Sequence, residues 1–398
     1  MRMRRVVSGV AVVLMGLCTA HCGAAAADGA APENASVESD LISSRTVLAE
    51  NGSITGNLFV DGGDVYWTEL DQPEIGSAAF RLRRSTERSA RPTTVAGDTF
   101  VFGSEISAIT GDANSVYVAV VPRSSSNRYS IRAYDRATGV GRNLGQAGGF
   151  PTSIAVRGDA LVLAVARDGS RFARASRIDR VALDGSGAST LLPGAGEVIT
   201  SLAVDTSDIN RLYWTDDGRN GGESQTGKVF SVRLPDGAKT LIADSRQFPL
   251  AALFPSVTQD AKNVYFAAGV YAGAIGVWPK DGSAAARELV TLGEGAILNG
   301  TPSSAVVDGS NVFFVASRKQ FRFGGDVLLR SSLAGAGVVK LDDSDIDGSD
   351  PGALDPQITK RASFSPLQQN DKAVFFTAIT YRGSSVKEAR VVRILKPR

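Results

Sequence analysis

A short apolar and aromatic phrase recurs seven times along the chain, and this repeat constrains the fold more than any other feature. The first copy is Val65-Tyr66-Trp67-Thr68, and the fourth is Leu212-Tyr213-Trp214-Thr215. The other five copies begin at Val116, Leu161, Val264, Val312 and Val374. Successive copies are separated by 51, 45, 51, 52, 48 and 62 residues. Spacings close to 50 residues are typical of proteins built from repeated structural units.

Each copy predicts a β-strand within a four-stranded unit, because β-branched and aromatic residues favour a pleated, half-buried surface. A turn phrase such as DGGD at 61 or DANS at 112 precedes it, and an apolar stretch such as SIAV at 153 precedes the turn. This pattern indicates a hairpin. A second hairpin follows in each unit, with Asp-Gly turns such as those at 184 and 281.

Four antiparallel strands of this length cannot bury both faces of their sheet alone, so the units are expected to stack face to face in a ring. The sequence therefore predicts an all-β fold, a seven-bladed β-propeller of four-stranded antiparallel blades, over residues 44–398.

The two ends of the repeat region predict how the ring closes. The last unit ends after its third strand, in ARVVRILKPR, and has no fourth strand after it. A matching segment, SRTVLAENG, lies at 44–52 and resembles the fourth strands at 92, 239 and 287. We expect this N-terminal strand to complete the last blade, which removes two free sheet edges.

The phrases VYWTE and LYWTD resemble the YWTD repeats of low-density-lipoprotein-receptor-type propellers, and the wider pattern is similar to NHL-type and other secreted bacterial propellers. Two of the seven copies carry the phrase, and the YWTD propellers have six blades where seven are predicted here. The resemblance implies the fold. It implies no function, because propellers serve as enzymes, receptors and scaffolds.

Residues 1–22 are predicted to be a signal peptide, because the basic start MRMRR precedes the apolar run VVSGVAVVLMGL. This run is too short to span a bilayer as a stable anchor. Cys22, followed by Gly23, resembles the lipid-attachment cysteine of bacterial lipoproteins. Ordinary cleavage within Ala24–Ala26 is the alternative. Residues 23–43 are small, polar and acidic, which predicts a flexible linker. The chain is thus expected to be exported, either lipid-anchored in the bacterial envelope or secreted.

Charge and residue usage exclude several classes of function. Without Arg2, Arg4 and Arg5 the chain has 40 basic and 41 acidic residues, so no basic footprint for nucleic acid remains. The cysteines are Cys18 and Cys22, and the single histidine is His21. Cleavage after position 21 leaves no histidine in the mature chain, which excludes Ser-His-Asp and Cys-His catalysis and metal sites built on histidine. We expect a monomer, with no membrane contact beyond the lipid anchor.

One face of the predicted ring is expected to carry arginines and aromatic side chains in the connections between second and third strands. We call this set the predicted rim; it contains Arg167, Arg171, Arg318, Arg322, Phe321 and Tyr381. Arginine binds carboxylates and phosphates in a bidentate manner, so the predicted rim suits a protein, a glycan or a small anionic ligand. The alternative explanation is a set of solvated arginines on long polar loops.

A candidate calcium site lies in LDDSDIDGSDPGALD at 341–355, where Asp343, Asp345 and Asp347 alternate before Gly348. Alternating carboxylates followed by glycine are typical of calcium loops. The twelfth position counted from Asp343 is Leu354, so EF-hand spacing fails. A solvated acidic insertion is the alternative.

The sequence favours an exported, envelope-associated propeller that acts as a non-catalytic ligand- or protein-binding module. The alternative is a calcium-dependent, carboxylate-based hydrolase, lactonase or lyase with its site at the channel mouth. Such an enzyme needs paired acids near the axis, and Glu105 and Glu197 are the main candidates. Trp67 and Trp214 are predicted to pack between blades.

Overall fold

The computed structural model describes most of the repeat region. All the regular secondary-structure elements among the described residues are β-strands. The described residues are 45–72, 76–86, 89–122, 128–166, 175–193, 198–216, 227–235, 237–248, 253–269, 273–292, 300–318, 326–335, 337–343, 360–382 and 385–397. They belong to the unit Leu41–Arg398. Within these ranges, no helix has the length and apolar character needed to cross a membrane.

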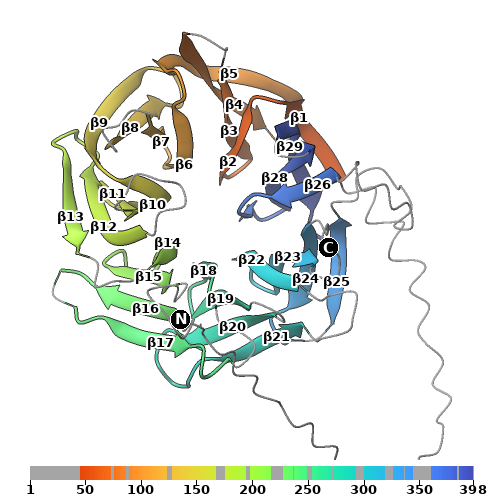
Figure 1. Cartoon of the computed structure of the whole chain (residues 1–398). Coiled ribbons are helices and arrows are strands. Elements are labelled where there is room, and N and C mark those ends of the chain that lie inside the picture. Colours follow the sequence, from red (N-terminus) through yellow and green to blue (C-terminus); the bar gives the residue numbers. More distant parts are fainter. Residues whose placement is uncertain are drawn as a thin grey trace, which may run out of the picture. The chain divides into compact units, whose positions relative to one another are not determined.

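The strands form seven antiparallel blades around a ring, as predicted (Figure 1). Blade 1 contains β2 (Ile54–Asp61), β3 (Asp64–Asp71), β4 (Ser77–Thr86) and β5 (Ser89–Val101). Blade 2 contains β6 (Glu105–Gly111), β7 (Ser115–Val121), β8 (Arg128–Asp135) and β9 (Gly141–Gly148). Blade 3 contains β10 (Phe150–Arg157), β11 (Ala160–Ala166), β12 (Ala175–Ala182) and β13 (Ala188–Leu192). Blade 4 contains β14 (Ile199–Val204), β15 (Arg211–Asp216), β16 (Lys228–Arg233) and β17 (Thr240–Asp244).

The remaining blades follow the same order. Blade 5 contains β18 (Ser256–Gln259), β19 (Asn263–Gly269), β20 (Gly273–Pro279) and β21 (Arg287–Leu292). Blade 6 contains β22 (Gly300–Val307), β23 (Asn311–Arg318), β24 (Asp326–Ser332) and β25 (Val338–Asp343). Blade 7 contains β26 (Lys360–Phe364), β27 (Gln368–Gln369), β28 (Ala373–Arg382) and β29 (Ser385–Leu395) together with β1 (Arg45–Asn51). The pair Ala175↔Ile199 also links blades 3 and 4.

The seven repeated phrases form the second strands of the blades, as predicted. These strands are buried on both faces, which explains why they are continuous apolar runs without polar alternation. Successive side chains point to opposite faces of a strand, and here each face meets a different neighbouring blade. Tyr213 belongs to an apolar cluster that includes Phe266 of blade 5, and the next residue, Trp214, belongs to one that includes Leu163 of blade 3. The prediction that the tryptophans pack between blades is confirmed.

Ring closure by the N-terminal strand is also confirmed. β1 pairs antiparallel with β29, from Arg45↔Ile394 to Asn51↔Ala389. Figure 1 shows β1 at the outer edge of the blade that contains β28 and β29. Leu48 of β1 packs into the same apolar cluster as Trp67 and Phe375, so the closing strand contributes to the core between blades 7 and 1.

Candidate functional site

Most of the sequence-predicted site residues lie outside the described residues. These are Arg167, Arg171, Phe321, Arg322, Asp345, Asp347 and the proposed lipid-attachment residue Cys22. The backbone is described for three others: Arg318 ends β23, Tyr381 lies near the end of β28, and Asp343 ends β25. The topology places Arg318 and Tyr381 at the same end of their second strands. The calcium site and the predicted rim both stay predictions.

At the other end of each second strand lies the turn that precedes it, and several blades have an aspartate in this turn. From the sequence alone this aspartate is predicted only to be a turn residue. In blade 2, Asp112 accepts hydrogen bonds from the backbone N–H groups of Asn114 and Ser115, and the Tyr117 hydroxyl donates to its other oxygen at 2.6 Å. Burial is the largest cause that raises the pKa of Tyr117 to about 12, and the hydrogen bond to Asp112 adds to it. Asp260 and Tyr265 repeat this arrangement in blade 5.

Among the described residues, a cation that directly follows the third strand of a blade pairs with the turn acid of the preceding blade at three interfaces. Lys280 contacts Asp205 at 2.7 Å, Lys396 contacts Asp308 at 3.2 Å, and Arg136 contacts Asp64 at 3.3 Å and also pairs with Asp61. The same cations lie 5.7, 5.3 and 5.0 Å from the ring centroids of Tyr213, Phe313 and Tyr66, respectively. These distances allow a cation–π attraction in addition to the ion pair.

The corresponding position is leucine in blades 3, 4 and 6, at Leu183, Leu234 and Leu333. In blade 3, Arg157 occupies the place of the turn acid, and it contacts blade 4 instead. Its Nε donates to the Ile209 carbonyl at 2.9 Å, and its Nη2 donates to Asn210 Oδ1 at 2.6 Å. Polar contacts near these turns therefore join several pairs of neighbouring blades, although the side chains differ.

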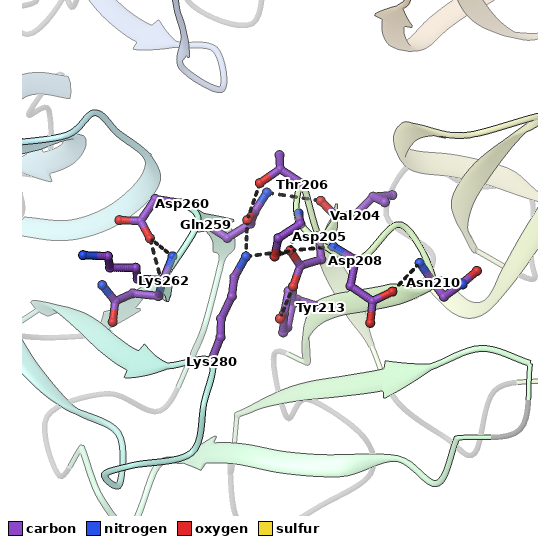
Figure 2. Close-up of polar contacts among 12 residues, drawn as sticks. Val204, Asp205, Thr206, Asp208, Asn210, Tyr213, Gln259, Asp260, Lys262 and Lys280 are labelled. Carbon is purple, nitrogen blue, oxygen red and sulfur yellow. Dashed lines mark hydrogen bonds and ion pairs between the residues drawn. The ribbon is translucent and has the colours of Figure 1, made fainter.

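Figure 2 shows the polar network at the interface between blades 4 and 5. Asp205 and Lys280 form a buried ion pair, with 2% and 8% of their side chains exposed. The Tyr213 hydroxyl donates to Asp205 Oδ2 at 2.6 Å, and the Ser207 hydroxyl donates to Oδ1 at 2.7 Å. Lys280 Nζ also donates to Gln259 Oε1 at 2.5 Å. Both oxygens of the Asp205 carboxylate thus accept hydrogen bonds from side-chain donors.

This network holds Asp205 in its ionised form. Burial on its own raises the pKa of Asp205, but the hydrogen bonds from Lys280, Tyr213 and Ser207 outweigh it and hold the pKa well below its ordinary value. Burial and the Asp205 carboxylate raise the pKa of Tyr213. At neutral pH Asp205 is therefore a carboxylate and Tyr213 a neutral phenol.

An open hollow of about 600 Å³ lies over this ion pair. One wall comes from the first turn of blade 4, with Ser207, Asp208 and Arg211. The other wall comes from two turns of blade 5; it contains Ala261, Lys262, Asn263, Pro279 and Asp281. Asp205 and Lys280 also line the hollow. The hollow lies at the end of the second strands opposite to the predicted rim, so sequence reasoning did not find it.

A second buried carboxylate joins blades 2 and 3. Asp179, with 2% of the residue exposed, receives a bidentate contact from Arg177 at 2.8 and 3.0 Å. Tyr129 of blade 2 donates to the same carboxylate at 3.1 Å, and Thr190 donates at 3.1 Å. Among the described residues there is no group of three or more histidine, cysteine or acidic residues that could hold a metal ion.

The comparisons with known proteins identify the fold. No protein-family model and no curated protein sequence matches the chain. A candidate 6-phosphogluconolactonase from Bacteroides fragilis is similar in structure, with 13% identity, a TM-score of 0.51, and coverage of 81% of this chain and 93% of that chain. The β-propeller domain of the Trilobed protease from Pyrococcus furiosus has 8% identity, a TM-score of 0.50, and coverage of 85% and 94%.

A structure from work on two prolyl endopeptidases has 10% identity and a TM-score of 0.55. The match covers 87% of this chain but only 50% of that longer chain. Similarity at these identities shows a β-propeller and leaves the function open, because the same fold carries different activities. The likeness to YWTD-type and NHL-type repeats stays a resemblance.

Replacement of Lys280 tests whether the ion pair stabilises the ring. We expect Lys280→Met to lower the free energy of unfolding by about 3 kcal/mol, because it leaves the Asp205 carboxylate buried without its cation. Urea denaturation measures this. Arg142→Met, at an exposed position of β9, is the control and should change stability by less than about 0.5 kcal/mol. Equal stability of the two variants would show that the pair contributes little.

The pH dependence of stability tests the ionisation of Asp205. Its folded pKa lies below the unfolded value of about 3.9, so its contribution is complete above that pH and is lost as the pH falls towards the folded pKa. We expect the stability difference between the wild type and Asp205→Asn to shrink by about 1 kcal/mol between pH 6 and pH 3. Urea denaturation of both proteins at each pH measures it, and a constant difference contradicts the assignment.

Proposed function

We propose that the chain is exported and that its propeller is a non-catalytic binding module for an anionic ligand or partner in the bacterial envelope. In this proposal residues 1–22 are a signal peptide, residues 23–43 are a linker and residues 44–398 are the binding domain. The predicted rim would supply arginines and aromatic rings on one face of the ring.

This proposal rests mainly on the hydrogen bonds and ion pairs that the buried carboxylates make within the protein. Within the described ranges the buried acids are Glu69, Asp179, Asp205 and Asp216. Each of the four accepts a hydrogen bond inside the ring. The contacts of Asp179 and Asp205 are given above. Glu69 accepts from Asn51 and Trp67, and Asp216 accepts from the backbone N–H of Val198. A general acid needs a raised pKa, whereas the hydrogen bonds to Asp205 hold its pKa below the ordinary value.

The residue content of the ring supports the same proposal. Residues 45–398 contain no histidine and no cysteine, so nucleophilic catalysis of the Ser-His-Asp or Cys-His type has no residues to use. The propellers of similar structure include a candidate lactonase and a protease domain, so the fold is compatible with a hydrolase as well as with a binding module. The hydrolase alternative would require calcium and paired acids at the channel mouth, for which Glu105 and Glu197 are the main candidates; Glu105 begins β6, and Glu197 lies outside the described residues.

Retention on an anionic glycan tests the binding proposal. We expect the wild-type protein to bind immobilised dextran sulfate, and the double variant Arg318→Ser/Arg322→Ser to bind about tenfold more weakly, because two charge-assisted contacts are removed. Arg142→Ser/Arg246→Ser, which changes the net charge equally at exposed positions, is the control. Equal binding of all three proteins rejects the predicted rim. Calcium-dependent hydrolysis of lactones by the wild type would support the enzyme alternative.

The export proposal has its own test. We expect the full-length chain in a bacterial host to be processed at Cys22, labelled by radioactive palmitate and recovered in the membrane fraction. Cys22→Ser should abolish the label. Intact mass spectrometry distinguishes the outcomes: an unlabelled chain cleaved beyond residue 22 indicates ordinary secretion, and an unprocessed chain in the cytoplasm contradicts export.

A further inference from the structure

The hollow between blades 4 and 5 exists because the first turn of blade 4 is longer than the equivalent turns. In blade 2 the turn closes with a hydrogen bond from Asp112 N–H to the Ser115 carbonyl, and in blade 5 with one from Asp260 N–H to the Asn263 carbonyl. In blade 4 the same bond runs from Asp205 N–H to the Arg211 carbonyl, which adds three residues to the turn. The longer turn forms a wall of the hollow.

The acidic groups that line the hollow are mostly neutralised by protein groups. Asp205 pairs with Lys280, and Asp208 pairs with Arg233 at 3.1 Å. Asp281 keeps its charge at the margin of the hollow, where it accepts a hydrogen bond from the Ser283 N–H at 2.9 Å. One carboxylate without a cation therefore remains among the described lining residues.

Two lining cations have no carboxylate partner among the described residues: Arg211 on the blade 4 wall and Lys262 on the blade 5 wall. Lys262 is exposed, and Arg211 is half-buried beside the Tyr213 hydroxyl. At the base, Lys280 Nζ donates to Asp205 and Gln259 (Figure 2). An ammonium has three donors, so one N–H of Lys280 remains for a ligand.

We propose that this hollow binds the anionic group of a small ligand, either a carboxylate or a phosphate, between Arg211 and Lys262 and above Lys280. Three cationic residues from two blades line this volume, whose acids are largely paired, and charge-assisted hydrogen bonds to such anions are among the stronger polar contacts in proteins. The proposal extends the proposed binding function to a second site, on the face of the ring opposite to the predicted rim.

Hydrogen bonds beneath the hollow tie its two walls together. Inner-strand contacts join the same two blades, since Thr200 Oγ1 donates to the Phe254 carbonyl at 2.8 Å and Gln259 Nε2 donates to the Val204 carbonyl at 3.2 Å. Gln259 therefore holds the inner strand of blade 4 with its nitrogen and Lys280 with its oxygen. A preorganised site loses less conformational entropy when an anion binds.

Isothermal titration calorimetry of the mature wild-type chain tests the proposal, with inorganic phosphate in one arm and citrate in the other, at constant ionic strength. We expect saturable binding of at least one anion with one site per chain. Lys262→Gln and Arg211→Gln should each weaken binding about tenfold or more, and Lys262→Glu should abolish it. The control Arg142→Gln, which makes the same change in net charge on blade 2, should bind within about twofold of the wild type.

Binding in a single arm supports the proposal and identifies the anion class. Absence of saturable heat in both arms overturns it, as does an equal loss in Arg142→Gln and Lys262→Gln, which would indicate a general charge effect. The Arg318→Ser/Arg322→Ser variant separates this proposal from the proposed function. It should keep phosphate or citrate binding in the hollow even if its dextran sulfate binding is lost.

Discussion

The structure depends on the burial of each blade's second strand between two neighbouring blades. The second strand has apolar side chains on both faces, and an isolated four-stranded sheet leaves at least one of those faces in water. Tyr213 and Trp214 illustrate the solution, because adjacent residues pack against blades 5 and 3, respectively. No blade can satisfy its own core, so the ring must close. The pairing of β1 with β29 provides the closure and places the two ends of the repeat region in one blade.

Apolar packing alone leaves the ends of the second strands, where backbone turns meet water, without specific contacts between blades. The repeated turn aspartate and the cation that follows the third strand supply these contacts at three interfaces. Such partly buried pairs add little net stability when both members are replaced together, but the loss of one member leaves an unpaired charge. We infer that they define how neighbouring blades align. The arrangement at blades 4 and 5 is distinguished by a longer turn, which leaves an open volume above the pair.

The proposed binding function and the proposed anion site follow from which charges are paired. The buried acidic side chains accept hydrogen bonds from cations, hydroxyls, amides and backbone groups inside the ring, so their oxygens are used in contacts within the protein. Arg211 and Lys262, by contrast, have no carboxylate partner among the described residues of the hollow. A recessed volume whose acids are largely paired and whose walls carry Arg211 and Lys262 is well suited to hold an anion.

The sequence by itself determined the strand content, the number of blades and the closure by residues 44–52, because these features depend on local apolar patterns and on the 45- to 62-residue repeat. It also marked Asp112, in the phrase DANS, as a turn residue. Only the tertiary structure decided which cation meets which aspartate. Lys280 and Asp205 are 75 residues apart, and no local pattern links them. They meet because stacking brings the end of one blade's third strand beside the first turn of the blade before it. The hollow above them has the same origin, since its walls come from two blades that are adjacent only in the folded ring.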